Sequence, residues 1–134
     1  MNRTHLEGAA EALAVQQGYA FHTGPEDGMA HTVRSYPAAW LAPLELHAVE
    51  GRGHGRATYD MTLHLLSSGA RLSPAERRAA LARMEEQLLE IFAALSLDER
   101  VLAVEGLSVR PRAFALTPHG EISQTAAARI VTFF

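Results

Sequence analysis

Arg56-Ala-Thr-Tyr-Asp-Met-Thr-Leu-His-Leu-Leu66 is the stretch whose pattern constrains the fold most strongly. Its odd-numbered residues, from Ala57 to Leu65, are apolar, and its even-numbered residues from Arg56 to His64 are polar. Strict alternation over this length is typical of a β-strand with one face on a core and the other toward water or a partner. We therefore expect the preceding residues to form a hairpin with this strand, and the following ones to pack around it.

The residues before this strand predict its partner. In residues 44–48 the even-numbered positions are apolar, so they should face the core. Because residues paired across two strands share a face, even numbers must pair with odd ones. A four-residue loop at residues 52–55, closed by Gly51 opposite Arg56, meets this condition. The predicted pairs are Leu44–Leu63, Leu46–Met61 and Ala48–Tyr59 on the core face, and His47–Asp60 and Glu45–Thr62 on the outer face.

Apolar residues at helical spacing predict two helices. The shorter helix covers about residues 4–17: Thr4 and Glu7 form a capping box, and a following glycine ends it. The longer helix, about residues 74–95, begins after the capping sequence of residues 73–76, which has proline at the first helical position. Its apolar stripe should lie across the core face of the strand pair. The stripes are Leu6, Ala9, Ala10, Leu13 and Ala14 in the first helix, and Ala80, Leu81, Met84, Leu88, Ile91, Phe92 and Leu95 in the second.

The segments between the first helix and the hairpin predict shorter elements. Residues 19–23 alternate and are compatible with a short strand, and residues 24–28 carry the proline and glycines of a turn. Residues 29–37 suit either an extended segment or an ordered loop. Because proline cannot donate a hydrogen bond to a sheet, any strand between Pro37 and Pro43 should be an edge strand, or become regular only after Pro43.

The C-terminal third predicts a second hairpin. Residues 101–105 and 107–110 have strand-like patterns, with Gly106 at a bulge or bend between them. A turn at residues 117–120 leads into residues 122–134, where apolar side chains on both faces near the end indicate burial on both sides. The whole order predicts an α+β fold, with a mainly antiparallel sheet and the long helix on one face.

The totals describe one domain, residues 1–134. The 134 residues are 48% apolar, which suffices for a core without metals or disulfides. There is no cysteine, which excludes thiol nucleophiles and thiolate metal sites. A net charge of −3 argues against a dedicated nucleic-acid binder. The N-terminus has no uninterrupted apolar run, so we expect neither a signal peptide nor a membrane span.

The sequence contains no motif for catalysis or cofactor binding. The seven histidines are dispersed without the i, i+4 pair of a compact site, so we interpret them as surface residues, with metal binding as the alternative. The glycine-rich residues 51–55 lead into a strand, whereas phosphate-binding loops lead into a helix. Asp60 opposite His47 lacks the third member of a triad, so we interpret this pair as a cross-strand ion pair. We predict no catalytic residue, metal or cofactor.

Several short features follow one another along nearly the whole chain. They are Phe21-x-x-Gly24, Tyr36-Pro37, Leu41-x-Pro43-Leu44, Tyr59-x-Met-x-Leu-x-Leu65, Ser73-Pro-Ala-Glu-Arg77 before a helix, and the terminal strand pair. This order resembles that of small bacteriophage tail-terminator (tail-completion) and neck proteins. The resemblance rests on topology and apolar spacing.

The resemblance implies a structural protein without enzymatic activity. Its copies would form a ring, such as a hexamer, that caps the tail tube and joins it to the head, in contact with other tail or neck proteins. It would be cytoplasmic during assembly and then part of the virion tail, without sequence-specific binding to nucleic acid and without a membrane. The candidate contact residues are Arg52, His54 and Arg56 at the hairpin tip, loop 24–36, His47 and Asp60 on the outer sheet face, and Phe133 and Phe134 at subunit interfaces.

Two other functions stay open from the sequence. One is a small ligand-binding or enzymatic domain with a pocket between helix and sheet that uses His47, Asp60 or His64. The other is an adaptor that binds a partner at its sheet edge. The apolar Val49 and the terminal aromatic residues, on a face that one long helix would leave open, favour an assembly over a monomer.

Overall fold

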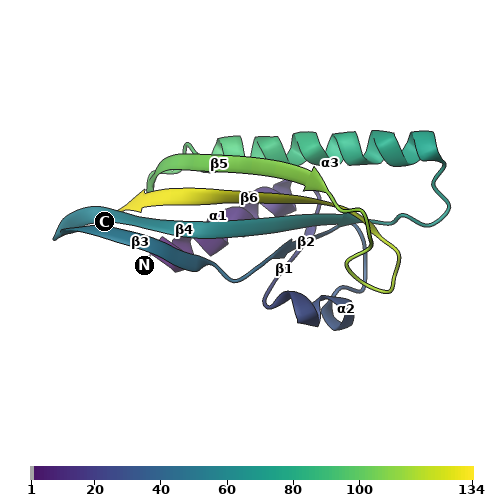
Figure 1. Cartoon of the computed structure of the whole chain (residues 1–134), viewed down its shortest axis with the longest axis horizontal. Helices are drawn as coiled ribbons and strands as arrows, with labels where there is room; N and C mark the ends of the chain where they lie inside the picture. Colours follow the sequence, from purple (N-terminus) through teal and green to yellow (C-terminus); the bar gives the residue numbers. More distant parts are fainter. Residues whose placement is uncertain (1) are drawn as a thin grey trace.

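The alternating stretch forms the central strand of a six-stranded sheet in a computed structural model that describes residues 2–134 (Figure 1). The elements are α1 (Asn2–Gln16), β1 (Ala20–Thr23), η1 (Glu26–Gly28), α2 (Met29–Thr32), β2 (Ala38–Leu41), β3 (Glu45–Arg52), β4 (His54–Ser67), α3 (Pro74–Leu95), β5 (Val101–Pro111) and β6 (Ile122–Phe133). The strand order is β1-β2-β4-β6-β5. β3 pairs with residues 54–60 of β4, beside the part of the same edge that pairs with β2. All pairs except β1–β2 are antiparallel, so the α+β prediction is confirmed.

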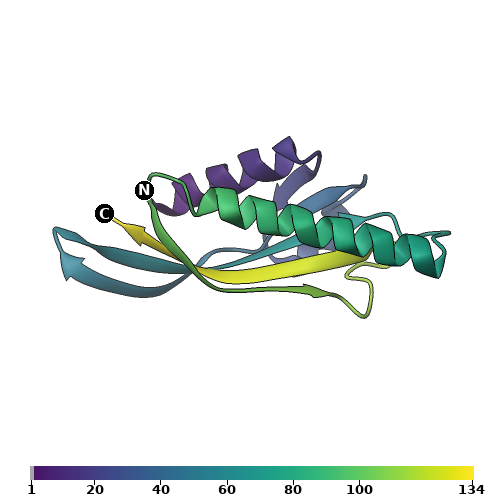
Figure 2. The ribbon, with the colours of Figure 1, turned by 90° about the horizontal axis from the view of Figure 1, so that it is seen from above.

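Two helices cover one face of this sheet (Figure 2). α1 lies over β1 and β2, and α3 lies over β5 and β6. The odd-numbered residues Met61, Leu63 and Leu65 of β4 belong to the core beneath them, and Tyr59 is partly buried at its margin. Both predicted helical stripes pack into this core. The predicted core face of β4 is therefore confirmed over the part of the strand that the helices cover.

The two helix starts test the capping predictions. α3 has the predicted capping box, because the Ser73 hydroxyl accepts from the Glu76 N–H and the Glu76 carboxylate accepts from the Ser73 N–H, both at 3.1 Å. The box predicted at Thr4 is wrong, since α1 already includes Asn2. The Asn2 side chain donates to Thr132 Oγ1 at 2.9 Å and to the Phe133 carbonyl at 3.1 Å. These contacts with the distant β6 extend the helix beyond its local signal.

Strand β2 corrects the prediction of an edge strand. It lies between β1 and β4, and all four of its residues are buried. Pro37 and Pro43 flank β2 without interrupting it, so neither missing N–H group falls within the ladder. The Pro37 carbonyl accepts a hydrogen bond from the Ala20 N–H at 3.1 Å, which aligns β1 beside β2.

The β3–β4 hairpin has a different register from the predicted one. Leu46 pairs with Tyr59 instead of Met61, and the strands meet at Gly53, with Arg52 opposite His54. Two glycines allow this tight turn, because Gly51 and Gly53 have positive φ angles of 102° and 60°. A bulge at residue 47 then changes the parity of the pairs. The remaining observed pairs are Glu45–Asp60, Ala48–Thr58, Val49–Ala57, Glu50–Arg56 and Gly51–Gly55.

Residues 29–37, which suited either an extended segment or a loop, begin with the one-turn helix α2. Together with η1 it covers one end of the sheet on the face away from α1 and α3. A second apolar cluster forms beneath it, made of Met29, Val33, Ala38, Trp40 and Leu66. The Trp40 indole N–H donates to the Gly24 carbonyl at 2.9 Å, so the turn before η1 is tied to the sheet.

The second hairpin follows the prediction. β5 changes register between Glu105 and Ser108, and Gly106 within this bulge has a φ of 63°. β6 is buried at Ile130 and Val131, but Phe133 and Phe134 are 47% and 49% exposed. The predicted burial on both sides therefore ends before the last two residues of the described chain.

Candidate functional site

The most exposed part of the sheet is the outer portion of the β3–β4 hairpin, residues 46–59, which we call the arm. All eight residues of β3 are exposed. The arm extends past the ends of both α1 and α3 (Figure 2). At about 3.3 Å per residue, the six steps from Leu46 to Arg52 give it a length of roughly 20 Å. β6 borders β4 as far as Arg56, so only the tip of the arm is purely two-stranded, and β3 forms an exposed edge along its whole length. An exposed edge strand is available for contact with another molecule.

The bulge at His47 gathers apolar side chains on one face of the arm. Leu46 pairs with Tyr59 and Val49 pairs with Ala57, so all four lie on the face that carries the helices further along the sheet. Phe134 extends this surface, because its backbone exchanges two hydrogen bonds with Gly55, of 3.0 and 3.1 Å. These side chains and Asn2 line a groove of about 370 Å³. Leu46 and Val49 are 51% and 55% exposed, so the apolar face is open to solvent.

The helical layer stops at the base of this groove. Asn2, the first described residue of α1, lines the groove, and the Arg3 guanidinium lies 5.4 Å from the centre of the Tyr59 ring. Arg3 also donates to the Leu44 carbonyl. The beginning of α1 therefore anchors the base of the arm, while Val49 is 55% exposed.

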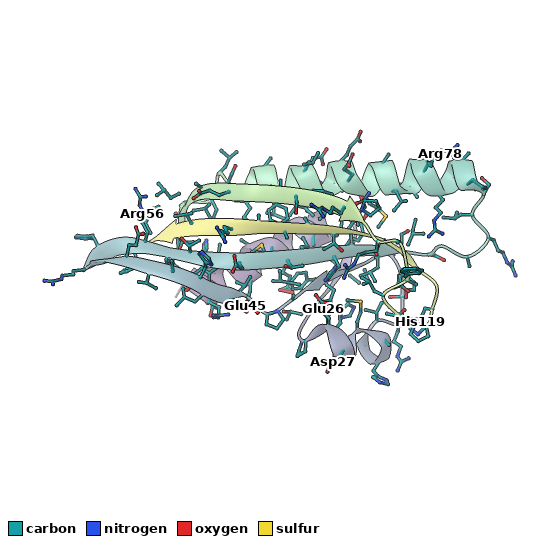
Figure 3. The ribbon with its side chains drawn as sticks, viewed as in Figure 1. Glu26, Asp27, Glu45, Arg56, Arg78 and His119 are labelled. Atoms are coloured by element: carbon teal, nitrogen blue, oxygen red, sulfur yellow. The ribbon has the colours of Figure 1, made fainter. Side chains whose placement is uncertain are left out.

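The tip of the arm is basic. Residues 51–59 contain Arg52, His54 and Arg56 and no acidic residue. Glu50 lies opposite Arg56 across the hairpin. Arg56, labelled in Figure 3, lies on the projecting part of the hairpin. The structure thus presents positive charge beside an exposed apolar face.

On the outer face of the sheet, His47 and Asp60 form the ion pair predicted from the sequence. His47 Nδ1 lies 3.5 Å from Asp60 Oδ2, and Arg129 Nε lies 3.5 Å from Asp60 Oδ1. Asp60, Arg129 and the small residues Ser108 and Ala127 line a shallow groove of about 590 Å³. Both Asp60 and His47 are well exposed, so this pair contributes little to stability.

His64 differs from the prediction that the histidines are surface residues. Only 1% of it is exposed, and η1 lies over it. His64 Nε2 lies 2.9 Å from the carboxylate of Glu26, which is labelled in Figure 3, and Nδ1 lies 2.7 Å from the hydroxyl of Thr125. Since a carboxylate only accepts, a neutral His64 donates from Nε2 and accepts the Thr125 hydroxyl at Nδ1.

Burial sets the charge of this histidine. Desolvation lowers the pKa of His64 below its ordinary value of 6.5, although the hydrogen bond and the negative charge of Glu26 act in the opposite direction. Arg112 adds to the lowering. His64 is therefore a neutral, structurally bonded side chain at neutral pH.

The three residues of the alternative pocket are not gathered at one point. His47 and Asp60 lie in the open part of the outer face, whereas His64 lies beneath η1. All three are on the face opposite the core between the sheet and the helices α1 and α3. Within residues 2–134, no group of three His, Asp or Glu side chains is placed to hold a metal ion.

The sequence pattern did not show the burial of His64, but one signal was present. Leu65 and Leu66 are consecutive apolar residues at the end of the alternating stretch, and they belong to different apolar clusters on opposite faces. Two adjacent buried residues in a strand require a cover on both sides. His64, whose side chain shares a face with Leu66, comes under the same cover.

Two comparisons with known proteins gave no match. No family model matches the chain, and no curated protein matches its sequence. In the part of the chain that the structure describes, no helix has both the length and the apolar character needed to cross a membrane. The functional conclusion must therefore come from the surfaces described above.

Proposed function

We propose that this chain is a structural subunit that assembles with copies of itself into a ring, which closes a phage tail tube and joins it to the head. The observation that carries the proposal is the arm, which exposes about half of Leu46 and Val49 next to a half-exposed Phe134. Exposed apolar side chains that adjoin one another are typical of a surface that is covered in an assembly. The phage context comes from the sequence resemblance alone.

The shape of the sheet gives further support. The helices α1 and α3 leave the edge strand β5 and the part of the other face that η1 and α2 do not cover open to neighbours. β5 exposes Leu102 by 49%. Open edges of this kind are normally blocked or paired. In the proposed ring the outer sheet face or the edge would meet adjacent subunits or the adjoining tail and neck proteins, in the cytoplasm during assembly and in the virion afterwards. The proposal assigns no catalytic step to the chain.

The test measures the absolute mass of the chain in solution by light scattering, at several protein and salt concentrations. We expect a discrete oligomer, or a monomer that assembles as the concentration rises, and rings in negatively stained electron micrographs. In a second experiment the chain is mixed with purified tail tubes, and electron micrographs are examined for added density at one tube end. A chain that stays monomeric at high concentration and also fails to bind tube ends would refute the proposal.

A further inference from the structure

A second exposed apolar surface lies between the two helices, at the end of α3 that is directed toward the arm (Figure 2). Ala9, Ala12 and Leu13 of α1 line a groove of about 270 Å³ together with Ala94 near the end of α3 and Leu97 just after it. We call this the helix groove. Leu97 is 85% exposed, and Leu89 on α3 is 46% exposed. The core packing of the helices therefore leaves apolar side chains on their outer surface as well.

The surroundings of the helix groove are acidic. Residues 5–16 contain two Asp or Glu residues and residues 84–99 contain five, and Arg3, Arg83 and Arg100 border these segments. Asp98, which lines the groove, pairs with His5 at 2.7 Å and lies near Arg100, so the carboxylates on the surface of α3 carry the negative charge of the border. Glu86, Glu90 and Ala94 follow one another at four-residue spacing, so these two carboxylates stand in line with the groove on the surface of α3. The seven acidic residues are Glu7, Glu11, Glu85, Glu86, Glu90, Asp98 and Glu99.

The arm and the helix groove are complementary in two respects. Each carries exposed apolar side chains, and the arm tip is basic whereas carboxylates border the groove. Opposite charges around an apolar contact favour one docking orientation and oppose others.

We propose that the arm of one copy docks in the helix groove of the next copy. Val49 and Leu46 would lie against Leu13 and Leu97, while Arg52 and Arg56 would approach the carboxylates of Glu86 and Glu90. The two surfaces belong to different parts of the chain, so one copy can offer its arm to a second copy and its groove to a third, which is a head-to-tail contact. Repeated head-to-tail contacts produce a ring when the rotation closes, and a filament when it does not. This inference rests on the proposed self-assembly, but not on the phage context.

The absence of cysteine from the sequence makes a direct test possible. Two single variants, Val49→Cys and Leu97→Cys, are purified separately, mixed, and treated with a short bis-maleimide cross-linker. We expect the mixed dimer to form several-fold more efficiently than either homodimer. The matched control mixes Leu97→Cys with Phe114→Cys, because Phe114 is 86% exposed but lies in the loop between β5 and β6. That pair should give only the background yield.

A charge exchange provides the second readout. Arg52→Glu with Arg56→Glu should abolish assembly and cross-linking, and combining it with Glu86→Arg and Glu90→Arg should restore both. Cross-linking no better than the Phe114 control, or Val49→Cys linking to itself as well as to Leu97→Cys, would overturn the docking mode.

The outcomes separate this inference from the proposed function. If the unmodified chain assembles but the Val49–Leu97 link does not form, the ring proposal stands and the docking mode fails. If the chain stays monomeric at all concentrations, the docking mode fails. The ring proposal is then decided separately, by whether the chain binds to tail tubes.

Discussion

Strand β4 has two different environments along one continuous pattern. Near Leu65 both of its faces are covered, one by α1 and α3 and the other by η1 and α2. Near Val49 its hairpin carries similar apolar side chains, but of the two helices only the start of α1, at Asn2, borders them, and Val49 is 55% exposed. The comparison shows that alternation in a strand identifies which side chains share a face, whereas coverage of that face depends on how far the neighbouring elements extend.

The two regions should therefore respond very differently to the same kind of truncation. Leu63→Ala, at a fully buried core position, should lower the free energy of unfolding by about 3 kcal/mol, through lost apolar contact and the cavity left behind. Val49→Ala on the arm should change it by less than about 0.5 kcal/mol, because that side chain is already half exposed. Urea unfolding followed by circular dichroism measures both, at a protein concentration low enough to keep the chain monomeric.

Equal losses for the two variants would contradict the comparison. Such a result would mean that the arm is packed as tightly as the body of the sheet, for example through a partner present even in dilute solution. The mass of the sample, measured under the same conditions, separates these cases.

The covered end of β4 should be sensitive to acid, with a smaller effect than the core truncation. Because burial lowers the pKa of His64, the unfolded chain binds a proton at this residue more readily than the folded chain. Stability should then fall as the pH drops below about 6.5, the ordinary value for histidine. Trp40, the only tryptophan, is 2% exposed in the cluster beside His64, so its fluorescence reports loosening there.

Two histidine variants isolate this effect. His64→Gln should weaken the pH dependence between about 5 and 7. His54→Gln, at the exposed arm tip, is the matched control variant. A wild-type profile that stays flat over this range, or one that His64→Gln does not alter, would show that the proton on His64 is not linked to folding.

The smallest effect on folding is expected at the arm tip. Arg52 and Arg56 are exposed, so replacing both with glutamate should change the free energy of unfolding of the monomer by no more than about 0.5 kcal/mol. The same variant is expected to lose assembly completely. A large loss of monomer stability would instead assign these arginines a structural role and remove the contrast between the two regions.

Local signals in the sequence predicted the elements well where neighbouring residues act together. The bounds of α3 follow from Ser73 and Glu76, whose side chains and backbone satisfy each other over one turn. The register of the β3–β4 hairpin could not be predicted from such local signals. One inserted residue at position 47 exchanges the two faces for the rest of β3. No neighbouring residue in the sequence signals this bulge, which lies at the base of the arm close to where Arg3 contacts Tyr59.

The candidate site was predicted in part. The basic tip and the terminal aromatic residues were visible as candidate contacts, because charge and apolarity are properties of the residues themselves. Their assembly into one surface with Leu46 and Val49 was not visible, since it requires the changed register and the return of Phe134 beside Gly55. The helix groove was also hidden, because it joins α1 to the end of α3 across more than 70 residues of sequence.

The amino-acid sequence by itself determined the α+β class, the central strand and the long capped helix, because each follows from interactions within a few residues. Only the tertiary structure decided that β2 is an inner strand, that His64 is buried and that the arm is exposed. Those outcomes depend on where distant segments lie: η1 over His64, β1 beside β2, and the start of α1 at the base of the arm. Burial is a property of what lies opposite a side chain, and in this chain the opposite surface comes from residues far away in the sequence.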